Sequence, residues 1–210
     1  MDFPAHPILL PCNRPANGTC LIGQDVPPGR EAHAARIERA TEWLQLASGR
    51  DDIHVVRRAS GRPVLAPPHS ELGTSMATSG GWLAVVADIS AGACIGVDIE
   101  FEDPSLDPYT FARDHYAPAE RAAVASLPEA AARRHVFRLW VAKEALLKLT
   151  GRGVFDGLDA PDLSALGDDF GGSSGVAIPA SAQVPAARLV VGSYPGVGPT
   201  DLQFAVASAL

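Results

Sequence analysis

The sequence predicts an α+β protein in which two similar α+β halves form a pseudo-dimer within one chain. Each half contains a long helical segment, at residues 30–49 and 129–149, followed by a pair of β-prone segments. One strand of each pair has the same apolar texture, WLAVVADI (82–89) early and LQFAVASAL (202–210) late. A length of 210 residues allows one larger domain or two domains of about 100 residues. We expect two domains, an N-terminal half at 1–95 and a C-terminal half at 96–210.

The first half reads as one helix among short strands. Its expected elements are a short strand in PILLP (7–11), the helix 30–49, a short strand at 52–58, and the strands TSMATS (74–79), WLAVVADI (82–89) and CIGVDIE (94–100). The helix has a rough apolar face and is followed by Gly49, a typical stop. Gly80 and Gly81 predict a hairpin. The turn SAGA (90–93) is expected to extend it into a meander of adjacent strands.

The second half reads as helices followed by strands. Its expected elements are two helical stretches within 104–127, the helix 129–149, and the closing strands ARLVVGSY (187–194) and LQFAVASAL (202–210). Pro118 suits a first helical turn, Pro128 separates two helices, and Gly151 suits a C-terminal cap. Residues 151–184 are rich in Gly, Asp, Ser and Pro and are expected to be loose. The last strand is apolar enough to be central in its sheet.

Composition argues against several classes of protein. The net charge of −7 argues against broad nucleic-acid binding, which requires a basic face. The sequence has neither the apolar run of a membrane span nor the basic start of a signal peptide, so we expect a soluble protein. The three cysteines are odd in number and lack zinc-binding spacing. They are typical of free thiols in a reducing compartment, and we expect a cytoplasmic protein.

Basic residues gather near the end of the long helix, although the chain as a whole is acidic. Of the 17 basic residues, six lie within twenty positions, against the single acid Glu144: Arg133, Arg134, Arg138, Lys143, Lys148 and Arg152. Lys143 and Lys148 are the only two lysines, and the other basic residues are fifteen arginines. A lysine offers a compact point charge to phosphate. The alternative interpretation is a solvated helix face.

An acidic pair stands on the strand IGVDIE. Asp98 and Glu100 are two positions apart, so their side chains point to one face while Val97 and Ile99 point to the other. Two carboxylates on one face repel each other unless cations or donors intervene. Magnesium takes a few carboxylate oxygens and completes its shell with water and phosphate. An edge strand with a wet polar face is the alternative interpretation.

A further acidic residue, Glu144, lies on the long helix. Trp140, Glu144 and Lys148 are spaced i, i+4, i+8 and form one stripe. A Glu-to-Lys pair at this spacing can simply stabilise the helix by about 0.2–0.5 kcal/mol. Combined with Asp98 and Glu100, however, Glu144 would complete a three-carboxylate magnesium site, and Lys143 and Lys148 would neutralise phosphate.

Two motifs resemble those of a known enzyme family. GVDIE (96–100) and WVAKEALLK (140–148) match, at every defining position, the two motifs of the 4'-phosphopantetheinyl transferase superfamily. Weaker similarity extends through GRP (61–63), TSMATSGGW (74–82) and FARDHYAPAE (111–120). The chain length resembles the two-domain, surfactin-synthetase-activating type, which implies a monomer with two similar halves. The trimeric acyl-carrier-protein synthase type needs only about half this length.

The resemblance implies a reaction and its participants. Members of this family transfer 4'-phosphopantetheine from coenzyme A to a serine of an apo acyl or peptidyl carrier protein, and adenosine 3',5'-bisphosphate leaves. The residues implied as magnesium ligands are Asp98, Glu100 and Glu144. Glu144 is also a candidate base toward the serine hydroxyl, although a water molecule is an equal candidate. The residues implied as contacts to coenzyme A are Lys143, Lys148, Arg62 and, more loosely, Arg36. Lys148 is also a candidate catalytic residue.

The sequence departs from the family pattern at one point. A Ser-His pair is usual before the glycine turn, where this chain has Ala77 and Thr78. A threonine hydroxyl can contact the 3'-phosphate of coenzyme A but brings no charge. Because of Thr78, a second interpretation stays open, in which the protein is a non-catalytic module that binds coenzyme A or carrier proteins. An unrelated phosphohydrolase with an acidic site is a third interpretation.

An acidic carrier protein would be recognised by basic side chains. The cluster proposed for this contact comprises Arg113, Arg121, Arg133 and Arg134. The sequence does not indicate which carrier protein or pathway is served.

Overall fold

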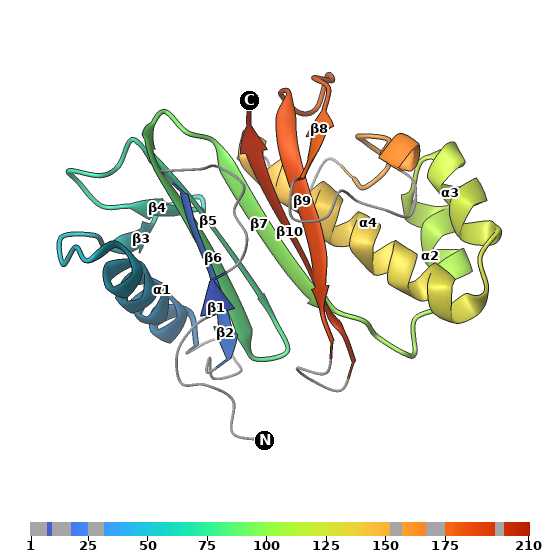
Figure 1. Cartoon of the computed structure of the whole chain (residues 1–210), viewed down its shortest axis with the longest axis horizontal. Coiled ribbons are helices and arrows are strands. Elements are labelled where there is room, and N and C mark those ends of the chain that lie inside the picture. The colour runs from blue at the N-terminus through green and yellow to red at the C-terminus, as the bar shows by residue number, and fades with distance from the viewer. Residues whose placement is uncertain (1–7, 10–17, 25–31, 152–156, 167–174, 196–199) are drawn as a thin grey trace.

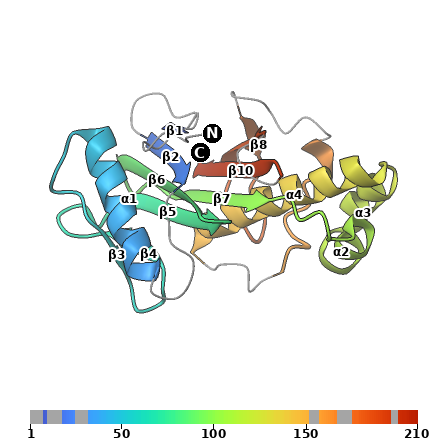
Figure 2. The same cartoon turned by 90° about the horizontal axis from the view of Figure 1, so that it is seen from below.

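The computed structural model describes residues 8–9, 18–24, 32–151, 157–166, 175–195 and 200–210 (Figure 1). Most of residues 1–30, where the sequence predicts a short strand at 7–11, and parts of the stretch 151–184 therefore lie outside the described residues. Within the described residues, two four-stranded antiparallel sheets lie side by side, and helices cover their outer faces (Figures 1 and 2). The structure confirms the predicted α+β class.

The first sheet has the strand order β1-β2-β6-β5. The elements of this half are β1 (Ile8–Leu9), β2 (Gly18–Gln24), α1 (Ala32–Ser48), β3 (Val55–Arg57), β4 (Pro63–Leu65), β5 (Leu72–Ser79) and β6 (Trp82–Ala91). Strands β3 and β4 form a separate two-stranded sheet. Gly80 (φ 54°) and Gly81 (φ 84°) form the turn of the predicted hairpin, because glycine adopts positive φ without strain.

The second sheet has the strand order β7-β10-β9-β8. The elements of this half are β7 (Ile95–Phe101), α2 (Pro108–His115), α3 (Pro118–Ala125), α4 (Glu129–Thr150), η2 (Ser164–Leu166), β8 (Val176–Ile178), β9 (Ala187–Tyr194) and β10 (Leu202–Ala209). The left-handed residue Gly151 (φ 73°) ends α4, as predicted. Strand β10 lies between β7 and β9 and is central, also as predicted.

The two halves share one topology. In each half the first long strand pairs with the last strand, and the preceding strand of the closing hairpin pairs on its other side. The orders are β2-β6-β5 and β7-β10-β9. A helix separates the first strand from the hairpin in both cases, α1 in one half and α4 in the other. The similarity lies in topology, whereas the division of the chain between residues 95 and 96 stays a prediction.

Three apolar clusters form successive layers. The cluster between α1 and the first sheet includes Trp43, Leu44 and Val85. The cluster between the sheets joins residues such as Ile22 and Trp82 to Val97 and Phe204. The third cluster packs the second sheet against α2, α3 and α4; its members include Tyr116, Val136, Leu139, Ala142, Leu146, Leu189 and Ala205. Helix α4 is therefore buried along most of its length, which fixes its position on the second sheet.

The expected meander is wrong at β7. This strand follows β6 in sequence but pairs with β10, in a continuous register from Ile95–Ser208 to Phe101–Leu202. Strand β7 also lies next to β5, but the two strands are joined by hydrogen bonds to side chains of β5 and not by a backbone ladder. The N–H of Val97 donates to Ser75 Oγ (3.2 Å), and the N–H of Phe101 donates to Ser79 Oγ (3.2 Å). The chain thus changes sheets at the SAGA turn.

None of the described helices is both long and apolar enough to span a bilayer.

Candidate active site

Helix α4 lies directly on the acidic face of β7. Val97 and Ile99 belong to the core between the sheets, so the alternate residues Gly96, Asp98 and Glu100 face the other way, toward α4. A Cβ atom at Gly96 would collide with the carbonyl oxygen of Ala145 in α4. The missing side chain at Gly96 therefore allows the close approach of the helix.

This approach joins Asp98 to Lys148. The ammonium Nζ of Lys148 lies 2.7 Å from Asp98 Oδ1 and donates a second bond to the carbonyl oxygen of Val97 at 3.1 Å. The Asp98 side chain is only 5% exposed, whereas that of Lys148 is 26% exposed. Burial raises the pKa of Asp98 to about 8; the Lys148 ammonium opposes this shift, and the carboxylates of Glu144 and Glu100 add to it.

The carboxylates of Glu144 and Glu100 are each held by one further donor. Trp140 Nε1 donates to Glu144 Oε1 (2.8 Å), and Glu144 Oε2 lies 4.0 Å from Lys148 Nζ. Ser79 Oγ, from the first half, donates to Glu100 Oε2 (2.8 Å). Burial raises the pKa of Glu100; the Ser79 hydrogen bond opposes the shift and the Glu144 charge adds to it. Three predicted carboxylates thus influence one another electrostatically.

The donor chemistry of this cluster suits a hard divalent cation. Asp98 Oδ2 is buried and has no hydrogen-bond partner, which is unusual for a carboxylate oxygen and leaves it free to accept a cation. In the described part of the chain, however, no three His, Cys, Asp or Glu side chains are arranged as a set that could hold a metal ion. Lys148 supplies the positive charge nearest to Asp98. The assignment of Asp98, Glu100 and Glu144 as magnesium ligands therefore stays a proposal.

Lys143 lies away from these carboxylates. It is fully buried, and its ammonium pairs with Glu120 Oε1 at 2.8 Å, with both side chains 0% exposed. It also donates to the carbonyl oxygen of Pro161 at 2.6 Å and lies 5.6 Å from the centre of the Tyr116 ring. Burial lowers the pKa of Lys143 and the Glu120 charge opposes this shift. The expected contact of Lys143 with phosphate is not supported by this position.

Arg62 reaches the same end of α4 as Lys148. Its Nη1 atom lies so close to Gly151 that a Cβ there would collide with it. Arg62 and Arg58 also line a hollow of about 210 Å³ together with Glu71 and the start of β5. The C-terminal end of a helix favours a cation, which is consistent with the position of the guanidinium.

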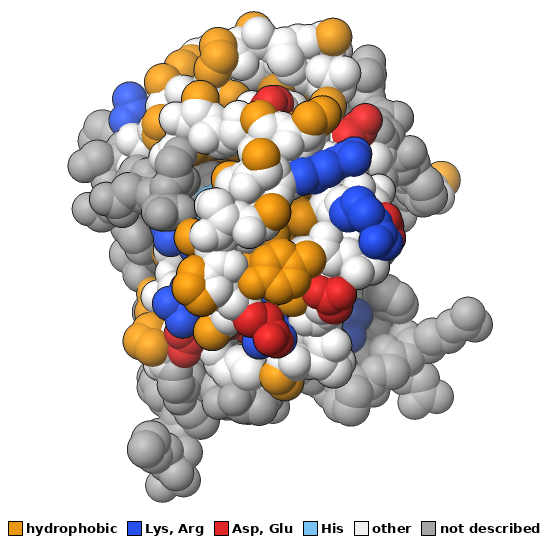
Figure 3. Space-filling model, turned by 90° about the vertical axis from the view of Figure 1, so that its right-hand side faces the viewer, with side chains coloured by type: hydrophobic (Ala, Val, Ile, Leu, Met, Phe, Trp, Pro, Cys, Tyr) orange, Lys and Arg blue, Asp and Glu red, His pale blue; other side chains and the backbone are white. Residues whose placement is uncertain are grey.

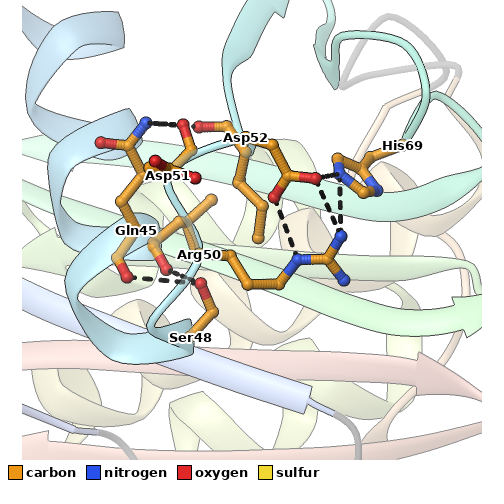
Figure 4. Close-up of polar contacts among 8 residues, drawn as sticks. Gln45, Ser48, Arg50, Asp51, Asp52 and His69 are labelled. Atoms are coloured by element: carbon orange, nitrogen blue, oxygen red, sulfur yellow. Dashed lines mark hydrogen bonds and ion pairs between the residues drawn. The ribbon is translucent and has the colours of Figure 1, made fainter.

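A polar network joins the turn after α1 to His69, which directly precedes residues of this hollow (Figure 4). Arg50 forms two bonds of 3.0 Å with Asp52, and His69 Nε2 lies 2.9 Å from Asp52 Oδ2. The hydrogen bond from Arg50 holds the pKa of Asp52 well below its usual range. His69 directly precedes Ser70 and Glu71, which line the hollow. The turn after α1 is thereby tied to the segment that enters β5.

Arg36 and Thr78 are not brought to the carboxylates. Thr78 is half-buried on β5, on the face that Leu72 and Met76 pack toward α1. Arg36 is half-buried on α1, and its Nε is buried with no hydrogen-bond partner. Both residues belong to the first half, and their contact with a ligand stays a prediction.

Sequence reasoning missed several residues that support the site. Ser79 was part of a hairpin pattern, and nothing in that pattern indicates that it reaches Glu100. The Trp140 side chain stacks on Phe111 of α2, with ring centroids 5.0 Å apart and planes 12° apart. Glu120 was one acid in a helical stretch. Its carboxylate accepts from the Ala117 N–H, as in a capping box, but Ala117 lacks the hydroxyl that makes this motif recognisable in a sequence.

Basic, acidic and hydrophobic side chains are interspersed on the face formed by α2, α3 and the start of α4 (Figure 3). Most of the predicted cluster is engaged within the chain: Arg113 pairs with Asp114, Arg121 bonds the Tyr116 carbonyl, and Arg133 pairs with Glu129. Arg134 is 54% exposed and lies 3.8 Å from Glu102. Arg134 and Arg138 line a hollow of about 150 Å³ next to His135. Arg134 is thus better placed than Arg133 to contact a partner.

Known proteins resemble the part of the chain that carries the acidic site. Residues 94–185 match the model of the 4'-phosphopantetheinyl transferase superfamily. The chain is also 31% identical over 94 residues to the 4'-phosphopantetheinyl transferase HetI of Nostoc sp., an alignment that covers 45% of this chain and 40% of that relative. The chain thus spans less than half the length of this relative. The superfamily match contains Asp98, Glu100, Glu144 and Lys148, whereas Arg36, Arg62 and Thr78 lie outside it.

Replacing Gly96 by alanine should separate α4 from β7. The added Cβ meets the Ala145 backbone, which cannot rotate away, so the helix has to shift. We expect a loss of about 1–3 kcal/mol in the free energy of unfolding, measured by urea titration. A matched control is Gly49→Ala, which adds only backbone strain at φ 67° with no atom within 4 Å. A loss in Gly96→Ala no larger than that in Gly49→Ala would contradict the importance of this approach.

Proposed function

We propose that this chain is a magnesium-dependent 4'-phosphopantetheinyl transferase of the two-domain type. It would transfer 4'-phosphopantetheine from coenzyme A to a serine of an apo acyl or peptidyl carrier protein and release adenosine 3',5'-bisphosphate. The observation that supports this most is the contact between the two motifs. Lys148 of the second motif lies 2.7 Å from Asp98 of the first, with Glu144 and Glu100 beside them. The superfamily match over residues 94–185 covers the same elements.

The reaction requires charge neutralisation before a nucleophile can approach. In the proposed transfer, the serine oxygen forms a bond to the phosphorus that carries pantetheine, and the bond from that phosphorus to the bridging oxygen breaks. The serine proton passes to Glu144 or to a water molecule, the two candidate bases, and the leaving bisphosphate takes up the electron pair. Negative oxygens surround the phosphorus, so cationic groups facing them lower the barrier. Lys148 is the ammonium proposed to do this, because it contacts Asp98 and its side chain is still 26% exposed.

Magnesium, when bound, would supply the remaining positive charge and orient the diphosphate. Asp98, with its unpartnered buried Oδ2, is the first residue expected to hold it, together with Glu100 and Glu144. Trp140 and Ser79 would orient the latter two carboxylates through the hydrogen bonds described above. Supporting donors of this kind usually influence metal affinity strongly.

The nucleotide end of coenzyme A is proposed to lie toward Arg62. Arg62 and Arg58 line the hollow described above, and Arg62 also lies against Gly151, three residues after Lys148. Guanidinium groups bind phosphate through paired N–H donors. A cofactor extending from Lys148 to this hollow would contact both halves of the protein, which suits a two-half architecture.

Mass spectrometry of a carrier protein tests the proposal directly. Incubation with coenzyme A, magnesium and an apo carrier should increase the carrier mass by one phosphopantetheine. We expect Glu144→Gln and Lys148→Met to lower kcat/KM about 100-fold or more, because each removes a charge that faces the reacting phosphate or its metal. An unmodified carrier would favour a non-catalytic binding module, and coenzyme A cleaved without transfer would favour a phosphohydrolase.

The 3'-phosphate of coenzyme A should contribute little to affinity. Thr78 offers no charge. An ion pair between an arginine and the phosphate near the surface contributes only about 1 kcal/mol or less to the binding free energy. Removing the 3'-phosphate should therefore weaken binding by less than about tenfold in calorimetric titrations. Arg62→Ala should weaken coenzyme A binding at least as much, and should reduce the difference between the two ligands. A loss far above tenfold on removing the phosphate would contradict this prediction.

The basic face of α4 should contribute to recognition of an acidic carrier. The double reversal Arg133→Glu/Arg134→Glu should raise the KM for the carrier roughly fivefold or more without changing the KM for coenzyme A. Because Arg133 also pairs with Glu129, the single variant Arg134→Glu separates recognition from stability. Arg39→Glu, which reverses a partly exposed charge on α1, is the control. Unchanged kinetics in Arg134→Glu would remove this face from recognition.

A further inference from the structure

The Lys143–Glu120 pair is the most deeply buried ion pair in the described part of the chain, with both side chains 0% exposed. Burying two charges is costly unless each remaining donor and acceptor is satisfied. Here they are. Glu120 accepts from the N–H groups of Leu163 (2.7 Å) and Ala117 (3.0 Å) in addition to Lys143. Lys143 donates to Glu120 and to the Pro161 carbonyl, and its third side faces the Tyr116 ring.

The pair joins three separate segments of the second half. Glu120 lies on α3, Lys143 on α4, and Pro161 and Leu163 in the stretch that follows α4. The Lys143–Glu120 ion pair therefore joins the α2–α3 corner to α4. Lys143 is the neighbour of Glu144, and successive helical positions are about 100° apart. A side chain locked on one side of the helix thus fixes which way the next one points.

A chain of aromatic contacts connects the pair to Glu144. Tyr116, which faces the Lys143 ammonium, packs edge-on against Phe111 with ring centroids 5.6 Å apart. Phe111 stacks on Trp140 with centroids 5.0 Å apart. The indole N–H of Trp140 then donates to the Glu144 carboxylate at 2.8 Å. Tyr116 itself is fixed by its hydroxyl, which donates to the Val136 carbonyl at 2.7 Å.

We propose that the buried Lys143–Glu120 pair is a positioning device for Glu144, acting through the aromatic contacts between α2 and α4. Neither residue touches the reacting atoms. The pair holds the corner that carries Phe111, Phe111 sets the plane of the Trp140 ring, and that ring aims its N–H at the carboxylate. The kinetic consequences rest on the proposed function, whereas the structural consequence, the position of the Trp140 indole, does not.

The central experiment compares single and double variants of the pair. Lys143→Met and Glu120→Gln each leave one buried group without its partner, so each should lower the urea midpoint of unfolding. The double variant removes both charges at similar volume and should recover part of that midpoint, because the glutamine oxygen still accepts from one of the two N–H groups that bind Glu120. Lys143→Arg should unfold at a lower urea concentration than wild type despite keeping the charge, because a guanidinium carries five N–H donors where the site offers two acceptors and one ring face.

A folded double variant then separates positioning from stability. The ¹H–¹⁵N spectrum of the protein contains the indole N–H signals of three tryptophans. Trp140→Phe assigns the signal of Trp140, and Glu144→Ala shows where that signal moves when its side-chain acceptor is lost. In the double variant the Trp140 signal should move toward its position in Glu144→Ala. Turnover should fall about tenfold to 100-fold with an unchanged KM for coenzyme A.

Two results would overturn the proposal. One is a folded double variant whose Trp140 signal and turnover both equal those of the wild type, since the pair would then only stabilise the fold. The other comes from Phe111→Leu, which breaks the aromatic path without touching the ions and remains informative if the double variant does not fold. Unchanged signal and turnover in Phe111→Leu would exclude the path. Arg39→Met/Glu42→Gln, which removes an exposed ion pair of 3.1 Å on α1, is the control and should behave as wild type.

The kinetic and spectroscopic parts fail independently. A wild-type protein that modifies no carrier would refute the proposed function. The movement of the Trp140 signal in the variants would still support or overturn the positioning role, because it needs no substrate.

Discussion

The close approach of α4 to β7 is the constraint on which the candidate site depends. Gly96 permits it, and most of α4 is buried against the second sheet, so the helix has little freedom to retreat. The approach carries Lys148 to Asp98 and places Glu144 near both carboxylates of β7. A looser contact would let water separate these charges. Their mutual effect on the pKa of Asp98 depends on the low exposure that the packing enforces.

The first half contributes to this site although the two motifs lie in the second. Ser79 reaches from β5 to Glu100, and Arg62 reaches from the segment before β4 to the end of α4. The two halves are linked here because β7 belongs to the second sheet yet lies beside β5 of the first. The Ser75 and Ser79 hydroxyls of β5 accept hydrogen bonds from the backbone of β7. The arrangement explains why two halves of one chain are useful here. One half supplies the acidic strand and helix, and the other closes the open edge of that strand.

The sequence predicted the elements better than it predicted their partners. Helix α4 and its glycine cap follow from local rules, and the Gly80-Gly81 hairpin is equally local. The transfer of β7 to a second sheet depends on pairing with β10, about one hundred residues later, which no local pattern reveals. The same limit applies to Lys143. Helical spacing gives the direction of a side chain but does not say which element lies there, so its burial against Glu120 could not be anticipated.

The two lysines of the chain share a bonding pattern that accounts for their presence among arginines. Each ammonium bonds one carboxylate and one main-chain carbonyl of another segment: Lys143 bonds Glu120 and Pro161, and Lys148 bonds Asp98 and Val97. A compact group with three donors can satisfy such a site, whereas a planar guanidinium would leave buried N–H groups unpaired. Arginines on the surface, such as Arg50, instead pair side-on with a single carboxylate. Lysine at both positions therefore suits an ammonium that joins two segments of the chain. The two positions differ in how far the ammonium is exposed to solvent. Lys143 is enclosed, while Lys148 keeps one side open to solvent, where a phosphate could approach it.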